Sequence, residues 1–221
     1  MYTYEHPHPA VTTDVVVFTI RDERLQVLLV KRRNPPFTGC WALPGGFVNI
    51  DEDIEACALR ELQEETGVSG VFLEQLYTFG APDRDPRERV ITVTYYALVP
   101  HDHIRIEAAS DASAATWFDC TDLPALAFDH DQVIATALKR LRAKLQYSTV
   151  AFQFLPDKFT LSELQRVYEI ILDQTLDKRN FRRRMLSYGL LAATEEKVRN
   201  GNHRPARLYR PQTPGRVEFI K

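Results

Sequence analysis

Residues 45–68 read GGFVNIDEDIEACALRELQEETGV, and this stretch decides the fold of the front part of the chain. Two glycines lead into an acidic loop. From about residue 54 to residue 66 the residues are good helix formers, and Gly67 follows where a helix C-cap is expected. The stretch therefore predicts a short strand that ends on glycines, then a loop, then one helix.

The predicted helix places three glutamates on one face. At about 100° per residue, Glu61, Glu64 and Glu65 fall within an arc of about 100°. Carboxylates this close raise each other's pKa unless a cation lies between them. Hard divalent cations such as Mg²⁺ or Mn²⁺ take carboxylate oxygens and share them with substrate phosphates. The face is therefore either a metal site or, as the plainer alternative, a solvated acidic surface.

Segments rich in β-branched residues surround this helix and are typical of strands. Polar turns and the segment NPPFTG separate them. The predicted strands cover about 11–20, 25–31, 40–48, 71–79, 90–99 and 116–118, and a further helix is expected over about 131–145. This order predicts a mixed α/β domain whose chemistry lies on loops around the helix at 54–66.

Beyond residue 146 the pattern changes. Thr160 and Glu163 form a predicted capping box before LSELQRVYEIIL, and Asp177 is a good N-cap for KRNFRRRMLSY. Two strand-like segments around the turn RNGNH then indicate a hairpin. Helix, turn, helix and hairpin is the order of a winged helix-turn-helix. The predicted divisions are a first domain over 1–146, a linker over 147–156, a winged-helix domain over 157–213 and a tail over 214–221.

Charge is distributed unevenly along the chain. Residues 1–156 hold 14 Lys+Arg and 22 Asp+Glu, or −8, whereas residues 157–221 hold 14 and 8, or +6; the two sum to the net charge of −2. The acidic segment 1–156 and the basic segment 157–221 indicate two different functions, and the basic segment is suited to bind a polyanion. No apolar run approaches the length of about 20 residues that a bilayer span needs, so we expect a cytoplasmic protein that does not use a membrane.

The second helix of the back domain carries a basic surface. Phe181, Met185 and Tyr188 share its packing face, which leaves most of the basic face free. The N-terminal part of such a helix enters the DNA major groove, and the hairpin supplies cations for the backbone. The candidate DNA-binding residues are Lys178, Arg179, Asn180, Arg182, Arg183, Lys197, Arg199, Arg204 and Arg207. The alternative is a small basic module that docks to the first domain.

The opening stretch resembles the signature of the Nudix family without a departure. From Gly46 it runs through five residues to Glu52, seven residues to Arg60-Glu61-Leu62, one residue to Glu64-Glu65, and one residue to Gly67-Val68. The resemblance covers roughly residues 10–145. It implies a Nudix α/β/α sandwich with a mixed sheet, and hydrolysis of a nucleoside diphosphate linked to another moiety, with Mg²⁺ or Mn²⁺ held by this box.

The resemblance also implies roles for single residues. The expected metal ligands are Glu61, Glu64, Glu65 and the backbone carbonyl of Gly46 or Gly45. The expected catalytic residues are Glu61, Glu64, Arg60 and Glu52, of which Arg60 and Glu52 orient the others. The base for the attacking water is Glu61 or, from a loop beyond the box, Glu107 or Asp111.

The loop PDRDPRERV supplies the candidate substrate contacts. Arg84, Arg87 and Arg89 carry guanidinium forks, which suit phosphate or a terminal ribose, and Gly45 is expected beside them. A solvated loop of alternating charge is the alternative.

The whole chain resembles the Nudix-related transcriptional regulators of NAD metabolism. The segments that carry this resemblance are PGGFV, DRDPRERV, LAFDH, FTLSELQRVYE, DKRNFRRRM and RPARLYR. It implies a homodimeric regulator that binds operator DNA, and whose Nudix domain binds ADP-ribose or a related nucleotide; related regulators respond to sugars instead. Many such regulators have a degraded Nudix box, whereas this box is whole. The alternative is therefore a Mg²⁺-dependent pyrophosphatase that cleaves ADP-ribose to AMP and ribose 5-phosphate, with the second domain serving assembly.

Overall fold

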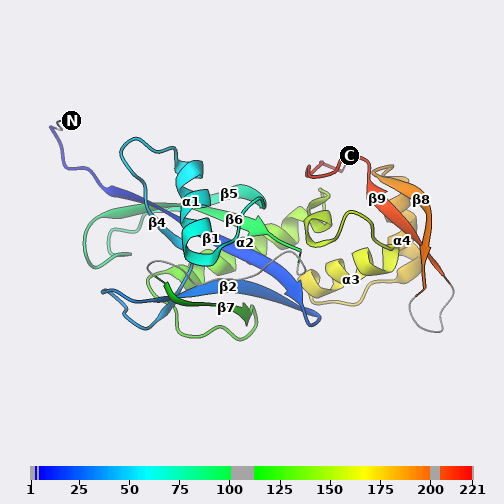
Figure 1. Cartoon of the computed structure of the whole chain (residues 1–221), viewed down its shortest axis with the longest axis horizontal. Helices are drawn as coiled ribbons and strands as arrows, with labels where there is room; N and C mark the ends of the chain where they lie inside the picture. The colour runs from blue at the N-terminus through cyan, green and yellow to red at the C-terminus, as the bar shows by residue number, and fades with distance from the viewer. Residues whose placement is uncertain (1–2, 4, 101–111, 200–204, 221) are drawn as a thin grey trace. The chain divides into compact units, whose positions relative to one another are not determined.

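The structure is a computed structural model of the chain and describes residues 3, 5–100, 112–199 and 205–220 (Figure 1). The chain divides into two compact units. The first holds most of the residues up to 138, and the second holds residues from 139 onward together with the segment 19–25. In the described residues, no helix is long and apolar enough to cross a membrane.

A mixed sheet forms the first unit. Its main path is β3-β2-β1-β6-β5, β4 pairs with β1, and β7 pairs with β2. The strands are β1 (Ala10–Arg21), β2 (Arg24–Arg32), β3 (Trp41–Ala42), β4 (Gly45–Phe47), β5 (Phe72–Phe79), β6 (Val90–Leu98) and β7 (Ala112–Asp119). β1 runs parallel to β6 and antiparallel to β4, and the second pairing sets Asp14 opposite Gly45. The glycines of the opening stretch therefore lie directly beside the central strand.

Helix α1 (Ile54–Thr66) has the bounds that the sequence predicts. The Asp53 carboxylate accepts a hydrogen bond from the amide of Glu55, and Gly67 ends the helix with a φ of 74°, in the left-handed region where glycine is favoured. The buried face of α1 presents Ala58 and Leu62 to an apolar cluster that includes Val15 of β1. Each fully buried aliphatic side chain of this size contributes about 1.5–3 kcal/mol, so packing fixes which face of α1 stays outside.

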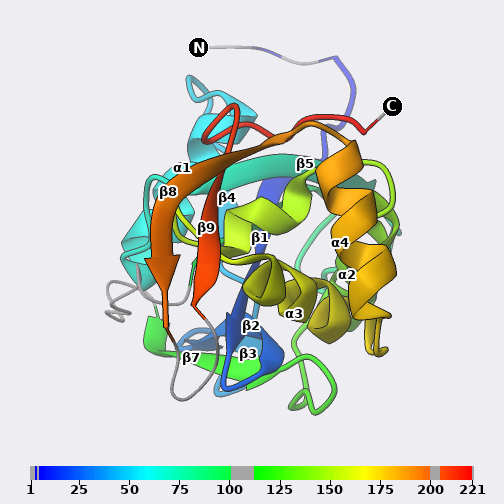
Figure 2. The ribbon, with the colours of Figure 1, turned by 90° about the vertical axis from the view of Figure 1, so that its right-hand side faces the viewer.

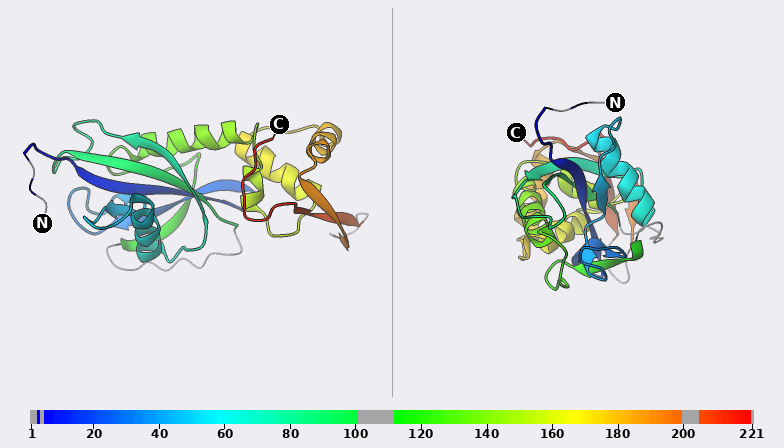
Figure 3. Two further views of the ribbon diagram at one scale, coloured as in Figure 1. Left: turned by 90° about the horizontal axis from the view of Figure 1, so that it is seen from above. Right: turned by 90° about the vertical axis from the view of Figure 1, so that its left-hand side faces the viewer.

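Two helices cover the sheet from opposite sides. Figure 3 shows α1 on one face and α2 (His130–Lys144) on the other. The middle of β1, from Val15 to Phe18, is completely buried, as expected for a strand covered on both faces. The α/β/α sandwich with a mixed sheet is therefore confirmed.

The second unit is built on two helices (Figure 2). α3 (Leu161–Leu172) begins with the capping box of Thr160 and Glu163, and α4 (Lys178–Ser187) begins at Asp177, whose carboxylate accepts from the amide of Asn180. Glu169 holds the turn between them, since its carboxylate accepts from the Leu176 amide at 3.0 Å. The buried contacts between the helices include an edge-to-face pair of the Tyr168 and Phe181 rings, 5.2 Å apart. Burial raises the pKa of Tyr168 to about 12.

A hairpin completes the winged helix. β8 (Leu191–Val198) pairs antiparallel with β9 (Ala206–Pro211). Phe159, just before α3, exchanges two backbone hydrogen bonds with Tyr209, at 2.8 and 2.9 Å. The chain entering the helix pair is thus fixed to the wing, and the predicted order of helix, turn, helix and hairpin is confirmed.

The segment 147–156 and the chain end contribute more structure than their composition suggests. Val150–Phe154 forms a short 3-10 helix, η2, with four buried side chains. The tail pairs with this region: Thr149 donates its amide to the Glu218 carbonyl at 2.9 Å, and Ile220 donates to the Tyr147 carbonyl at 2.8 Å. Backbone pairing rather than side-chain chemistry holds the tail, and composition does not reveal it.

Candidate functional site: a Nudix pocket and a basic winged helix

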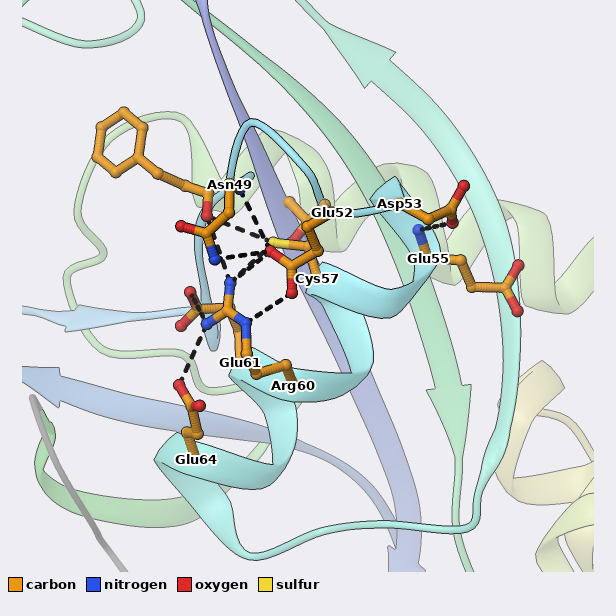
Figure 4. A network of polar contacts seen from close by, with 10 residues as sticks. Asn49, Glu52, Asp53, Glu55, Cys57, Arg60, Glu61 and Glu64 are labelled. Carbon is orange, nitrogen blue, oxygen red and sulfur yellow. Dashed lines mark hydrogen bonds and ion pairs between the residues drawn. The ribbon is translucent and has the colours of Figure 1, made fainter. Parts of the chain in front are cut away.

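Arg60 is the centre of the polar network on α1 (Figure 4). Its guanidinium binds Glu52 through two hydrogen bonds, from Nε at 2.7 Å and from Nη2 at 2.8 Å. Nη1 also donates to Glu61 at 2.7 Å and to Glu64 at 3.1 Å. The cation that relieves repulsion between these carboxylates is therefore the neighbouring Arg60, for which the family resemblance implies an orienting role.

The network shifts the acidity of its members in opposite directions. Hydrogen bonding from Arg60 lowers the pKa of Glu52 to about 2. Burial raises the pKa of Glu61, and the contact with Arg60 offsets only part of that rise. The carboxylates of Glu52 and Glu61 raise the pKa of Arg60, which stays charged. Glu61 is thus the carboxylate in this group that is shifted toward holding a proton, a property expected of a general base.

The backbones of Gly45 and Gly46 lie in close contact with the carboxylates of Glu65 and Glu61. Gly45 donates its amide to Glu65 Oε2 at 3.0 Å. Gly46 lies so close to Glu61 that a Cβ at this position would overlap the carboxyl group, so any larger residue would displace Glu61. The glycines are needed here for close approach of the backbone to the acidic face of α1.

These groups line one cavity of about 500 Å³. Its acidic wall comes from α1, and its cationic wall comes from the end of β2 and from the loop before β6. The wall residues that carry charge are Asp14, Lys31, Arg32, Arg33, Arg60, Glu61, Glu64, Glu65, Arg84, Asp85 and Arg87. Opposed acidic and basic walls suit a ligand that carries phosphates and, with them, a divalent cation.

The three arginines of the loop have different surroundings. Arg84 is buried, with 3% of its side chain exposed, and binds Asp129 through two hydrogen bonds of 3.0 and 2.7 Å. Arg87 lines the cavity, where Asp85 binds it at 3.0 and 2.8 Å and the rings of Phe47 and Phe128 lie 5.3 and 5.8 Å away.

The third arginine, Arg89, does not line the cavity. It donates to the carbonyls of Ala81 and Val90 instead. Arg84 and Arg87 both line the cavity, and Arg87 presents the more accessible guanidinium, with 38% of its side chain exposed against 3% for Arg84.

The donor atoms suit a hard divalent cation, although their arrangement is not a closed metal cage. Glu61, Glu64, Glu65 and Gly46 all line the cavity and offer carboxylate or carbonyl oxygens. Among the described residues, no three His, Cys, Asp or Glu side chains converge on one metal position. Arg60 holds two of the carboxylates, so a metal would share them with the guanidinium or displace it. The alternative bases Glu107 and Asp111 lie outside the described residues.

Several cavity residues are not predicted from the sequence, among them Asp14, Phe47, Asp85, Phe128 and His130. Asp14 lies in an apolar strand, Asp85 lies in a charged loop, and Phe128 and His130 lie in the segment LAFDH. Asp14 in the run TTDVVV was the available signal, because a carboxylate inside an apolar strand must be paired. Phe128, at a φ of 55°, has no comparable signal in the sequence.

The basic surface of α4 is largely free of internal pairing. Lys178, Arg179, Asn180 and Arg183 are exposed at the start of the helix. Arg183 donates to the Asn180 side chain at 3.2 Å, which orients both. Arg182 differs, because it is only half-exposed and donates to the Ser162 hydroxyl of α3 at 3.1 Å.

The hairpin adds a second basic group. Lys197 and Arg207 are opposite each other across β8 and β9, and both are exposed, as is Arg199. Arg204 lies outside the described residues. Cations on the wing and on the exposed N-terminal part of α4 match the placement expected of groups that contact a nucleic-acid backbone and a groove.

Comparison with known proteins identifies both units. Residues 11–140 match the model of the NUDIX domain, and residues 151–210 match the NrtR DNA-binding winged helix domain. The chain is 40% identical to the ADPR responsive transcriptional repressor NtrR of Acinetobacter baylyi, over 93% of this chain and 83% of that protein.

Two solved structures are similar to the chain. Shewanella oneidensis NrtR complexed with a 27mer DNA has 42% identity and a TM-score of 0.81, covering 91% of this chain and 93% of that one. The NUDIX domain of the same protein complexed with ADP ribose has 41% identity and a TM-score of 0.57, covering 62% of this chain and 90% of that one. The chain therefore belongs to the NrtR family, in which a Nudix domain is joined to a DNA-binding winged helix.

Proposed function

We propose that the protein is a transcriptional repressor that binds operator DNA through its winged helix and ADP-ribose through its Nudix pocket. The observation that carries the proposal is the union, in one chain, of a phosphate-suited cavity and an exposed basic recognition helix. The relatives add support, because one is described as an ADPR responsive repressor and another was solved with ADP ribose.

The DNA contacts follow from the exposed cations. The start of α4 would enter the major groove, where Arg179, Asn180 and Arg183 can reach base edges and Lys178 the phosphates. Lys197, Arg199 and Arg207 on the wing would neutralise further phosphates. Because operators with two-fold symmetry are read by two-fold symmetric proteins, we propose a homodimer as the binding species.

The nucleotide would lie between the two walls of the cavity. Arg87 is oriented to bind an anionic oxygen of the diphosphate, while Phe47, 40% exposed, offers a ring face for stacking. Mg²⁺ or Mn²⁺ would be held by Glu61, Glu64, Glu65 and the Gly46 carbonyl, and when bound it would neutralise diphosphate charge and lower the pKa of a coordinated water. Glu52 would keep Arg60 oriented toward these carboxylates.

A binding experiment tests this function. Labelled DNA from the region upstream of the protein's own operon is titrated with the protein at fixed salt, with random DNA of equal length as control. We expect at least about 1,000-fold tighter binding to the specific site, the lower end of the range for specific regulators. ADP-ribose should weaken that binding, whereas a panel of free sugars should not. Equal affinity for both DNAs would reject the repressor role.

Hydrolysis of ADP-ribose is the second candidate function, and one observation favours it. Every residue of the Nudix box is present, and three of its glutamates, Glu52, Glu61 and Glu64, are hydrogen-bonded to Arg60. The test is release of AMP from ADP-ribose by the Mg²⁺-loaded protein. No AMP above the level given by heat-denatured protein would reject hydrolysis and leave the repressor role standing.

A further inference from the structure

A buried polar group contributes to the lining of the Nudix cavity. Asp14, 7% exposed, accepts a hydrogen bond from the Thr92 hydroxyl at 2.6 Å and lies 3.7 Å from Nη2 of Arg84. Its second carboxylate oxygen lies 3.5 Å from Nε2 of His130. Burial of a carboxylate is unfavourable unless it is paired and hydrogen-bonded, so these partners together keep Asp14 inside the fold.

His130 joins this group to the backbone of the glycine segment. Its Nδ1 accepts the amide proton of Leu43 at 2.9 Å, which requires Nδ1 to be unprotonated and leaves Nε2 as the N–H that faces Asp14. The ring is 3% exposed. The charged groups around it are Asp14 on β1, Arg84 in the loop before β6, Asp129 beside it on the chain, and Arg32 on β2.

Leu43 is the first residue of the segment Leu43–Gly46, which packs against the carboxylates of α1 that line the cavity. The carbonyl of Pro44 accepts from Val15 at 2.9 Å, so β1 holds the segment one residue further on. Gly45 then donates to Glu65, and Gly46 contacts Glu61 so closely that no side chain fits between them. The position of the Leu43 amide therefore determines how the glycine backbone meets the carboxylates.

We propose that His130 and Asp14 are positioning residues of the ligand pocket. They fix the segment Leu43–Gly46 against Glu61 and Glu65, and thereby set the distance between the glycine backbone and the carboxylates that would share a divalent cation with a nucleoside diphosphate. The inference deepens the proposed function, because its ADP-ribose measurement rests on that function. It assigns the buried ionic group a role in ligand binding in addition to its role in stability.

Two substitutions of His130 distinguish its hydrogen bond to the Leu43 amide from the space that its ring fills. His130→Phe keeps an aromatic ring near Phe128, whose centroid lies 5.3 Å from that of His130, but removes the acceptor for Leu43. His130→Asn keeps an acceptor at the same distance from the backbone. Both variants are first compared with the wild type by circular dichroism and by tryptophan fluorescence, because Trp41 and Trp117 lie in this unit.

The affinities for ADP-ribose with Mg²⁺, and for Mn²⁺ alone, are then measured by calorimetry and electron paramagnetic resonance. We expect His130→Phe to weaken both by about tenfold or more, as for loss of a buried hydrogen bond, and His130→Asn to recover most of the loss. A folded His130→Phe variant with wild-type affinities, or an Asn variant as weak as the Phe variant, would overturn the proposal.

Two further outcomes are decided by the same measurements. If His130→Phe does not fold, the Thr92→Val variant is used, because it removes the hydroxyl that orients Asp14 and preserves side-chain shape. We expect it to bind Mn²⁺ and ADP-ribose about threefold more weakly, as for loss of one modest hydrogen bond. Affinities equal to those of the wild type would overturn the proposal. If the wild type binds no ADP-ribose, the proposed ligand is wrong. The positioning role then depends on Mn²⁺ alone, and equal Mn²⁺ binding by wild type and variant overturns it.

Discussion

Replacing Arg84 with methionine should destabilise the Nudix domain far more than the same change at Arg89, five residues along the same loop. The Arg84 guanidinium is nearly inaccessible and lies between two carboxylates, bonded to Asp129 at 2.7 and 3.0 Å and 3.7 Å from Asp14. Methionine keeps the length of the side chain and removes the charge, which leaves both carboxylates buried without their cation.

The magnitude follows from burial. The side chains of Asp14 and Asp129 are 11% and 12% exposed, so little solvent can replace the lost arginine. Removal of one partner from a buried ion pair costs about 3–5 kcal/mol. Arg89 is exposed and bonds only to backbone carbonyls. Surface changes of that kind stay within about 0.5 kcal/mol.

Urea unfolding followed by tryptophan fluorescence measures the difference, because Trp41 and Trp117 report only on the unit that contains Arg84. With a slope of about 1–3 kcal/mol per M urea, the Arg84→Met midpoint should fall by about 1–5 M and the Arg89→Met midpoint by less than about 0.5 M. Equal midpoints for the two variants would show that the buried pair contributes little, and would refute the reasoning.

Three further predictions concern pH, the carboxylates and the basic helix. Burial lowers the pKa of His130 from 6.5, so as pH falls the unfolded chain takes up a proton before the folded chain does. The free energy of unfolding should therefore fall as pH drops below about 6.5. His130→Asn, which lacks this titrating group, should show a flatter pH dependence between about pH 7.5 and 5.5. Glu64→Gln should reduce any AMP release from ADP-ribose at least about 100-fold and leave operator affinity unchanged, since filter binding and AMP release report on different units; loss of both on a folded protein would contradict this separation. Lys178→Ala should lower the slope of log affinity against log salt by about 0.9, because one phosphate contact is lost, whereas Arg216→Ala, an exposed change in the tail, should leave the slope unaltered.

Local signals in the sequence were sufficient for most elements. The caps at Asp53 and Gly67 set the bounds of α1, and the capping box at Thr160 set the start of α3. Each of these signals depends on residues within one helical turn, which is why a linear reading can find them.

The cavity depended on pairings that are distant in sequence. The register of β1 against β4 brings Asp14 to Gly45, and the fold brings His130 to Leu43, 87 positions away. No local pattern distinguishes the buried Arg84 from the cavity-facing Arg87, because both occur in one charged loop. Spacing could identify the carboxylates of α1, but it could not show that Arg60 already neutralises two of them.

The central claim is that one chain couples a nucleotide to an operator, and thermodynamic linkage tests it most directly. The affinity for labelled operator DNA is measured by fluorescence anisotropy with and without saturating ADP-ribose and Mg²⁺, and the affinity for ADP-ribose is measured with and without operator. The account predicts that each ligand weakens the other by the same factor, about 5- to 150-fold for a typical allosteric coupling. Tight but independent binding of both, with a factor of about one, would contradict it.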